Sequence, residues 1–157
     1  MISFTEAQLM AWLTPVLWPF LRVLALFQAM PVFGQRLVPA RVRVALAFLI
    51  ALAAGGVAPP TPEVALDSSL AMLLVIQQIL IGVSLGFAVR IVFSTVEFAG
   101  EIAGLQMGMN FAGFFDPGTG AQGTATARFF GTLVAFVFIA GGGHLLLIQA
   151  LAQSFHA

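Results

Sequence analysis

The chain has 157 residues and no formal net charge at pH 7, and it is 61% hydrophobic and only 8% charged. Soluble domains carry about 25% charged residues, so this chain lacks the polar groups that a water-exposed surface needs. Its neutral charge gives no electrostatic basis for nucleic-acid binding. There is no cysteine, and the two histidines, His144 and His156, are too far apart for a metal cluster. We therefore expect an all-α, membrane-type protein without cofactor, metal or enzyme active site.

Five apolar stretches follow one another along the chain and predict helical segments. They are roughly Leu9–Phe33, Val42–Val57, Leu70–Val96, Ile102–Phe115 and Phe129–Ala152. The first, third and fifth reach the ~20 residues that a membrane-spanning helix needs, whereas the second is marginal and the fourth is short. Alternatively, residues 70–115 form one long helix with a polar break at Glu97 and Glu101. No repeat or soluble domain interrupts the pattern, which predicts a single helical domain over residues 1–157.

Turn-forming residues separate these stretches. Pro31, Gly34 and Pro39 are expected to end the first helix, and a run rich in glycine and proline at positions 55–62 ends the second. The side chains of Asp67, Ser68 and Ser69 are typical of a helix N-cap, because they accept hydrogen bonds from the first free N–H groups. This arrangement predicts that the third helix begins there.

The strongest loop signal is the run from Asp116 to Gly120. The overlapping run Gly118–Gly123 matches the G-x-G-x-x-G pattern of dinucleotide-binding proteins. That chemistry requires a preceding strand and an acidic residue about 20 positions later, and this sequence has neither. The glycines therefore indicate a flexible loop and not a nucleotide site.

Glycines recur every four residues in two places, at Gly82 and Gly86 and at Gly100, Gly104 and Gly108. This spacing puts each set on one helix face. Small faces let helix backbones approach closely where lipid supplies no hydrophobic drive. Because glycine lowers helix propensity, we expect both faces to be compensated by packing on partner helices.

Four polar residues, Arg90, Ser94, Glu97 and Glu101, also share one helix face. Charges in an apolar helix rarely face lipid, so this polar seam is expected to be buried against another subunit or to line a water-filled path. The alternative is that residues 90–101 lie outside the membrane. Arg22 poses the same question in the first stretch, where it either pairs with a carboxylate or marks a segment that is never embedded in lipid.

Bulky aromatic side chains precede the glycine-rich loop. Phe111, Phe114 and Phe115 follow Met107 and Met109, and deformable apolar groups beside a flexible loop are suited to a reversible seal. Asp116 and Pro117 would fix a turn, and Gly118 and Gly120 would give the backbone freedom. The alternative is a helix end packed in an apolar core.

Several short motifs, taken in order, resemble the FliR family of flagellar export-gate proteins and its type III secretion counterparts. The resemblance covers nearly the whole chain and rests on Phe20–Val23, Pro31–Gly34, Val38–Arg43, Gly82–Phe87, Ala99–Gly108, Phe111-Ala112, Asp116-Pro117, Gly143–Leu145 and Ser154-Phe155. It implies a structural subunit of a helical export gate through which unfolded proteins pass. It also implies that the loop at 111–123 is a plug of the resting pore, and that the apolar helices need not span the bilayer.

The resemblance further implies the location and partners of the chain. These are the bacterial inner membrane at the flagellar basal body or secretion apparatus, FliP-like, FliQ-like and FlhB-like subunits, and unfolded exported proteins. Family members carry further helices after the position of Phe155, so this chain would lack the C-terminal part. A competing interpretation is a small transporter or ion channel with Arg90, Glu97 and Glu101 as a polar relay, although the sequence shows no repeated halves.

Overall fold

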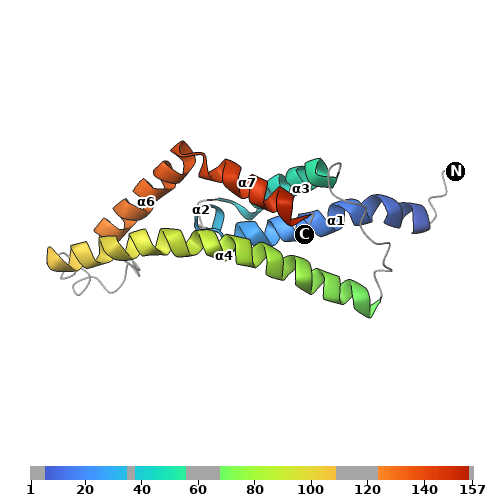
Figure 1. Cartoon of the computed structure of the whole chain (residues 1–157), viewed down its shortest axis with the longest axis horizontal. Coiled ribbons are helices and arrows are strands. Elements are labelled where there is room, and N and C mark those ends of the chain that lie inside the picture. The colour runs from blue at the N-terminus through green and yellow to red at the C-terminus, as the bar shows by residue number, and fades with distance from the viewer. Residues whose placement is uncertain (1–5, 35–37, 56–67, 109–123, 156–157) are drawn as a thin grey trace. The chain divides into compact units, whose positions relative to one another are not determined.

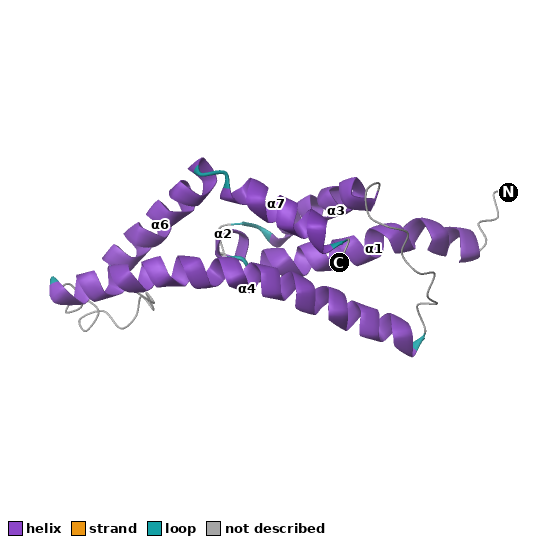
Figure 2. Ribbon diagram, viewed as in Figure 1, coloured by secondary structure: helices purple, strands orange, loops and turns teal. Residues whose placement is uncertain are grey.

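A computed structural model describes residues 6–34, 38–55, 68–108 and 124–155. Over these residues the chain is helical and contains no strand, as the apolar composition predicts (Figure 2). In chain order the helices are α1 (Glu6–Ala29), α2 (Pro31–Gly34), α3 (Ala40–Gly55), α4 (Ser69–Gln106), α6 (Ala125–Ala140) and α7 (Gly143–Ser154) (Figure 1). The expectation of an all-α, membrane-type protein is confirmed.

The structure changes three of the predicted helical segments. The third stretch and the start of the fourth form one continuous helix, α4, which ends at Gln106 and which Glu97 and Glu101 do not break. Of the alternative long helix over residues 70–115, positions 109–115 lie outside the described residues. The fifth stretch is two helices, because the chain turns at Gly141 and Gly142, and Gly142 has a left-handed φ of 72°. Glutamate is a good helix former, whereas a left-handed residue cannot continue an α-helix.

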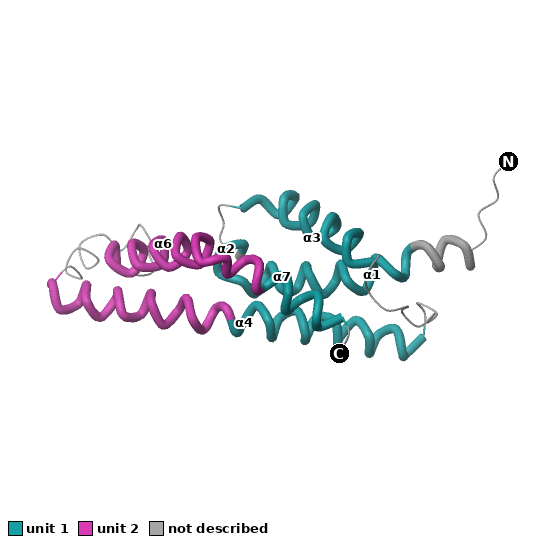
Figure 3. The backbone as a smooth tube through the Cα atoms, turned by 45° about the horizontal axis from the view of Figure 1, so that its top comes forward, with its two compact units in different colours: residues 1–88, 147–157 teal, residues 89–146 magenta. Residues whose placement is uncertain are grey.

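The chain divides into two compact units, which Figure 3 shows in different colours. Unit 1 comprises Met1–Ala88 and Leu147–Ala157, and unit 2 comprises Val89–Leu146. Unit 1 is therefore discontinuous in sequence, because its last eleven residues return to the N-terminal part.

The core of unit 1 forms around the middle of α1. Val23, Leu26 and Phe27 of α1 are buried together with Ala47 of α3 and Leu151 of α7. Ala47 is fully buried, which indicates a close approach of α3 at this point, since alanine projects only a methyl group. Around this cluster lie partly buried apolar side chains from every helix of the unit: Phe20, Leu24, Phe33, Leu46, Ile50, Leu85, Leu147 and Phe155.

Unit 2 is built on the second part of α4 and on α6. Phe93 of α4 and Phe138 of α6 meet edge to face with ring centroids 5.5 Å apart. Outside this contact the unit exposes large apolar side chains, among them Phe98 at 63% and Phe136 at 69%. A surface of this kind needs an apolar environment, which is either lipid or another protein.

Helix α4 is the one described helix that alone is long and apolar enough to cross a membrane, and its most apolar 18-residue window has a mean hydropathy of 2.2. Helices α6 and α7 pass the same test only if they are taken together as one broken span. The apolar part of α1, Leu13–Ala29, is too short for a membrane span by the same measure.

Candidate functional site

Gly82 and Gly86 bring α4 against the backbone of α1. A Cβ atom added at Gly82 would collide with the carbonyl oxygen of Arg22, and one added at Gly86 would lie 2.8 Å from the carbonyl oxygen of Leu26. Both glycines are buried. No larger residue fits at this distance, so the first glycine face marks a close approach of α1 and α4.

Gly100 and Gly104 have the same role between α4 and α6. An added Cβ would lie 2.9 Å from Phe130 Cβ at Gly100, and 2.9 Å from Thr124 Oγ1 at Gly104. Thr124 is the N-cap residue of α6 and accepts a hydrogen bond from the backbone N–H of Ala127 at 3.1 Å. The second glycine face therefore holds the first turns of α6 beside the end of α4.

Gly108 differs from the expectation. It follows the end of α4, its φ is 72°, and no atom of the described residues lies within 4 Å of an added Cβ. Its N–H instead donates to the carbonyl oxygen of Leu105 at 3.0 Å, in the turn that follows the helix. The period of four continues in the sequence, but the helix has already ended, so Gly108 supplies a left-handed turn and not a packing face.

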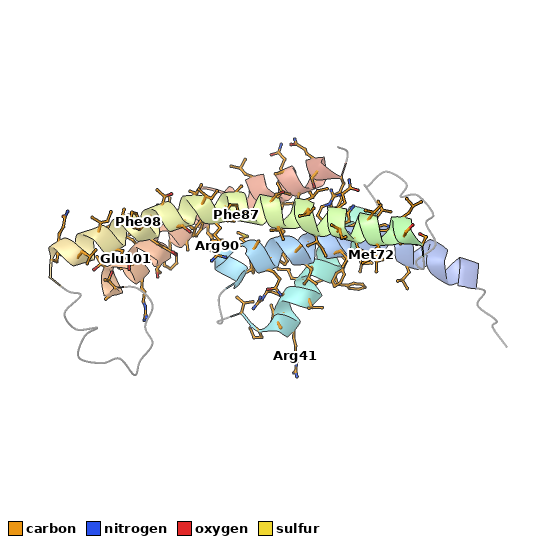
Figure 4. All side chains as sticks on the ribbon, turned by 90° about the horizontal axis from the view of Figure 1, so that it is seen from below. Arg41, Met72, Phe87, Arg90, Phe98 and Glu101 are labelled. Carbon is orange, nitrogen blue, oxygen red and sulfur yellow. The ribbon has the colours of Figure 1, made fainter. Side chains whose placement is uncertain are left out.

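The polar seam does not form one connected group. Glu97 is half-buried and its Oε1 would lie 2.8 Å from a Cβ on Gly131, so its carboxylate rests on the small surface of α6. Glu101 is half-buried and Arg90 is exposed, and Figure 4 labels both along α4. Within the described part of the chain, no ion pair joins Arg90 to either carboxylate.

Sequence reasoning missed Gly131 and Thr124 as members of the α4–α6 contact. Gly131 stands alone in its helix, so no four-residue spacing marks it, and only the position of Glu97 shows why a small residue is there. Thr124 carries a weak signal, because a threonine just before an apolar run is typical of an N-cap.

The predicted seal cannot be compared with the structure. Phe111, Phe114, Phe115, Asp116, Pro117, Gly118 and Gly120 all lie outside the described residues. The helices before and after this segment are described, and they pack together where Gly104 of α4 meets Thr124 at the start of α6. In the described ranges, no group of three or more His, Cys, Asp or Glu residues is placed to hold a metal ion.

Comparison with known proteins identifies relatives over nearly the whole chain. The family model described as bacterial export proteins, family 1, matches residues 13–157. Flagellar biosynthetic protein FliR of Escherichia coli K12 is 42% identical over 99% of this chain and 59% of its own length, and that of Pectobacterium carotovorum is 41% identical over the same shares. FliR of Bacillus subtilis 168 is 32% identical over 87% of this chain and 52% of its own length. The chain thus spans about three fifths of the enterobacterial relatives it matches.

Proposed function

Because the chain belongs to the bacterial export proteins, family 1, we propose that it is a structural subunit of the flagellar or type III secretion export gate. In this role it forms part of the channel through which unfolded proteins are exported, and it carries out no catalysis itself. The observation that carries the proposal is the family match over residues 13–157, together with relatives whose names place them in flagellar biosynthesis.

The dimensions of α4 support a place in a multi-subunit assembly. Its 38 residues make a helix about 57 Å long, whereas the hydrocarbon core of a bilayer is about 30 Å thick. Even a tilt of about 40° leaves a span of about 44 Å along the membrane normal. Exposed apolar side chains nevertheless continue from Leu70 near its start to Leu105 near its end. Lipid cannot cover all of them, so part of this surface needs other protein subunits.

The positions of the charged residues in α4 agree with a surface that is covered partly by lipid and partly by protein. Arg90, Glu97 and Glu101 all fall in the second part of the helix, after a first part that carries no charge. Lipid disfavours all three, whereas a subunit interface supplies counter-charges and hydrogen-bond partners. We propose FliP-like and FliQ-like proteins, with an FlhB-like subunit, as the neighbours, at the bacterial inner membrane.

Co-purification tests the proposal directly. An affinity-tagged chain is produced with the FliP-like and FliQ-like proteins of the same organism, and the complex is extracted in mild detergent. We expect the tagged chain to be recovered with both partners in one species. The chain produced alone should be aggregated or poorly folded, because its apolar surface is uncovered. A monodisperse, well-folded monomer that takes up neither partner would refute the proposal.

A further inference from the structure

Arg22 is a charged residue in the core of unit 1. It lies in the middle of α1, is only 6% exposed, and is followed directly by the fully buried Val23. A buried charge is strongly destabilising unless polar groups compensate it. Among the residues that the structure describes, no carboxylate pairs with it. Within that part of the chain, uncharged groups surround the guanidinium.

Three residues surround that guanidinium. Arg22 Nε donates to Oε1 of the buried Gln78 of α4 at 2.7 Å. Arg22 Nη1 donates to the backbone carbonyl oxygen of Ser154 and, at 2.9 Å, to Ser154 Oγ. The ring of Phe155 completes the site, with its centroid 4.5 Å from Arg22 Cζ, within the range of a cation–π contact. All of these residues belong to unit 1.

Within this site, Arg22 supplies a hydrogen-bond donor and a favourable charge to the C-terminal end of α7. A helix end leaves its last four carbonyl groups without intrahelical donors, and its partial negative charge favours a nearby cation. The last turn of α7 has no basic residue of its own. The carbonyl of Leu151 accepts from Ser154 Oγ at 2.6 Å, and that of Ala152 accepts from the N–H of Phe155 at 3.2 Å. Arg22 supplies the donor for the last carbonyl from another helix.

The first glycine face explains how Gln78 reaches this point. Gly82 lies one turn after Gln78 on the same face of α4, and it packs directly on the carbonyl oxygen of Arg22. This close approach leaves the Gln78 side chain at hydrogen-bonding distance from Arg22 Nε. Helices α1, α4 and α7 therefore meet at one polar point beside the apolar core of unit 1.

We propose that Arg22 is the positioning residue that docks the end of α7 onto the rest of unit 1, as a C-terminal cap supplied from 132 positions away in the chain. It acts through the N–H donors and the positive charge of its guanidinium group, and Gln78 orients that group. This inference concerns the folding of unit 1 and is independent of the proposed export function.

Amide hydrogen exchange of the full chain in detergent, or in its complex, measures the docking of α7. Arg22→Met keeps the length of the side chain but removes its donors and charge, so exchange in residues 147–155 should rise about tenfold or more. Arg22→Lys keeps the charge without the planar set of N–H donors, and exchange in residues 147–155 should rise by an intermediate amount. Arg41→Met is the matched control, because Arg41 is exposed, and exchange in α7 should not change.

Two milder variants cover the case in which Arg22→Met does not fold. Gln78→Leu removes the acceptor of Arg22 Nε, and Ser154→Ala removes one of the two acceptors of Nη1. Each should raise exchange at the end of α7 about two- to fivefold. The proposal is overturned if Arg22→Met leaves the exchange of α7 unchanged, or if it raises exchange in α3 as much as in α7. It is also overturned if neither milder variant has an effect.

Discussion

At Gly82 a single methyl group decides whether α4 can reach α1. Gly82→Ala gains roughly 1 kcal/mol of helix propensity. Its Cβ would collide with the backbone carbonyl of Arg22, which cannot rotate away as a side chain would. Overpacking of this kind typically costs about 1–3 kcal/mol of stability. In this variant it would also move Gln78 away from Arg22. We therefore expect a lower midpoint of thermal unfolding for the detergent-solubilised chain.

Gly55→Ala is the matched control for this substitution. A Cβ at Gly55 would lie 3.5 Å from the nearest atom, the carbonyl oxygen of Pro15, which is an ordinary contact. This change should leave the midpoint unchanged or raise it, by up to about 1 kcal/mol in stability. If Gly82→Ala were as stable as Gly55→Ala, the close contact of α1 with α4 would not contribute to stability.

For a single residue, the sequence predicts the type of contact but not which helix or side chain lies on the other side. The spacing of Gly82 and Gly86 predicts a small face, because a four-residue repeat stays on one side of a helix. It does not indicate α1 as the neighbour, since that depends on the path of the whole chain. For Arg22 the sequence leaves open a carboxylate partner. Among the described residues, the structure supplies an amide and a helix end, and a single amide such as that of Gln78 carries no pattern that marks it.

For the element α6, the cap at Thr124 is expected to contribute measurably to stability. Thr124→Ala removes the acceptor of the Ala127 N–H, and the loss of such a cap typically costs about 1 kcal/mol. Thr124→Ser keeps the hydroxyl group and should stay close to the original protein. Hydrogen exchange in the first turn of α6 measures the difference. A serine variant as damaged as the alanine variant would show that the methyl group of Thr124, which serine lacks, matters more than the cap.

Gly104→Leu should separate α4 from the first turn of α6. A Cβ there would already lie 2.9 Å from both Thr124 Oγ1 and Thr126 Oγ1, and leucine adds three further carbons. We expect the yield of the complex with partner subunits to fall several-fold, and Gly104→Ala to have a smaller effect. Val92→Leu, at an exposed position of the same helix, is the control. Normal assembly of Gly104→Leu would mean that the α4–α6 contact is loose.

Hydropathy alone does not predict that α4 continues through Glu97 and Glu101. A pair of glutamates in an apolar run suggests an interruption, since charges are disfavoured in lipid. The backbone has no reason to break there, and the side chain of Glu97 finds room over Gly131. The break that does occur, at Gly141 and Gly142, depends on a left-handed residue, which is a backbone property that a hydropathy profile does not record.

For the whole molecule, composition predicts the fold class but not what covers its surface. An apolar content of 61% excludes an ordinary soluble domain, and the structure leaves side chains such as Phe98 and Phe136 exposed. Lipid and subunit interfaces favour the same residue types, so hydropathy does not distinguish them. The length of α4 argues for both, because the helix exceeds the thickness of the bilayer and exposes apolar side chains near both of its ends.

The last prediction concerns the seal of the proposed pore. A channel wide enough for an unfolded polypeptide would leak ions when idle unless an apolar, movable segment filled it. The segment after α4 supplies three phenylalanines and several glycines, and the helices on either side of it pack together where Gly104 of α4 meets Thr124. Replacing Phe114 and Phe115 with alanine, or deleting Gly118–Gly123, should therefore raise the resting ion conductance of cells that make the complete gate.

Assembly should survive both changes, because a shorter connection between α4 and α6 still closes at little entropic cost. Phe129→Ala, which removes an exposed phenylalanine outside the segment, is the control and should leave the conductance unchanged. Ion leakage and the yield of the complex are measured on the same cells. An unchanged leak at normal yield would identify the segment as a connecting loop. A lost complex would instead place Phe114 and Phe115 in a packed core, as in the alternative that the sequence leaves open.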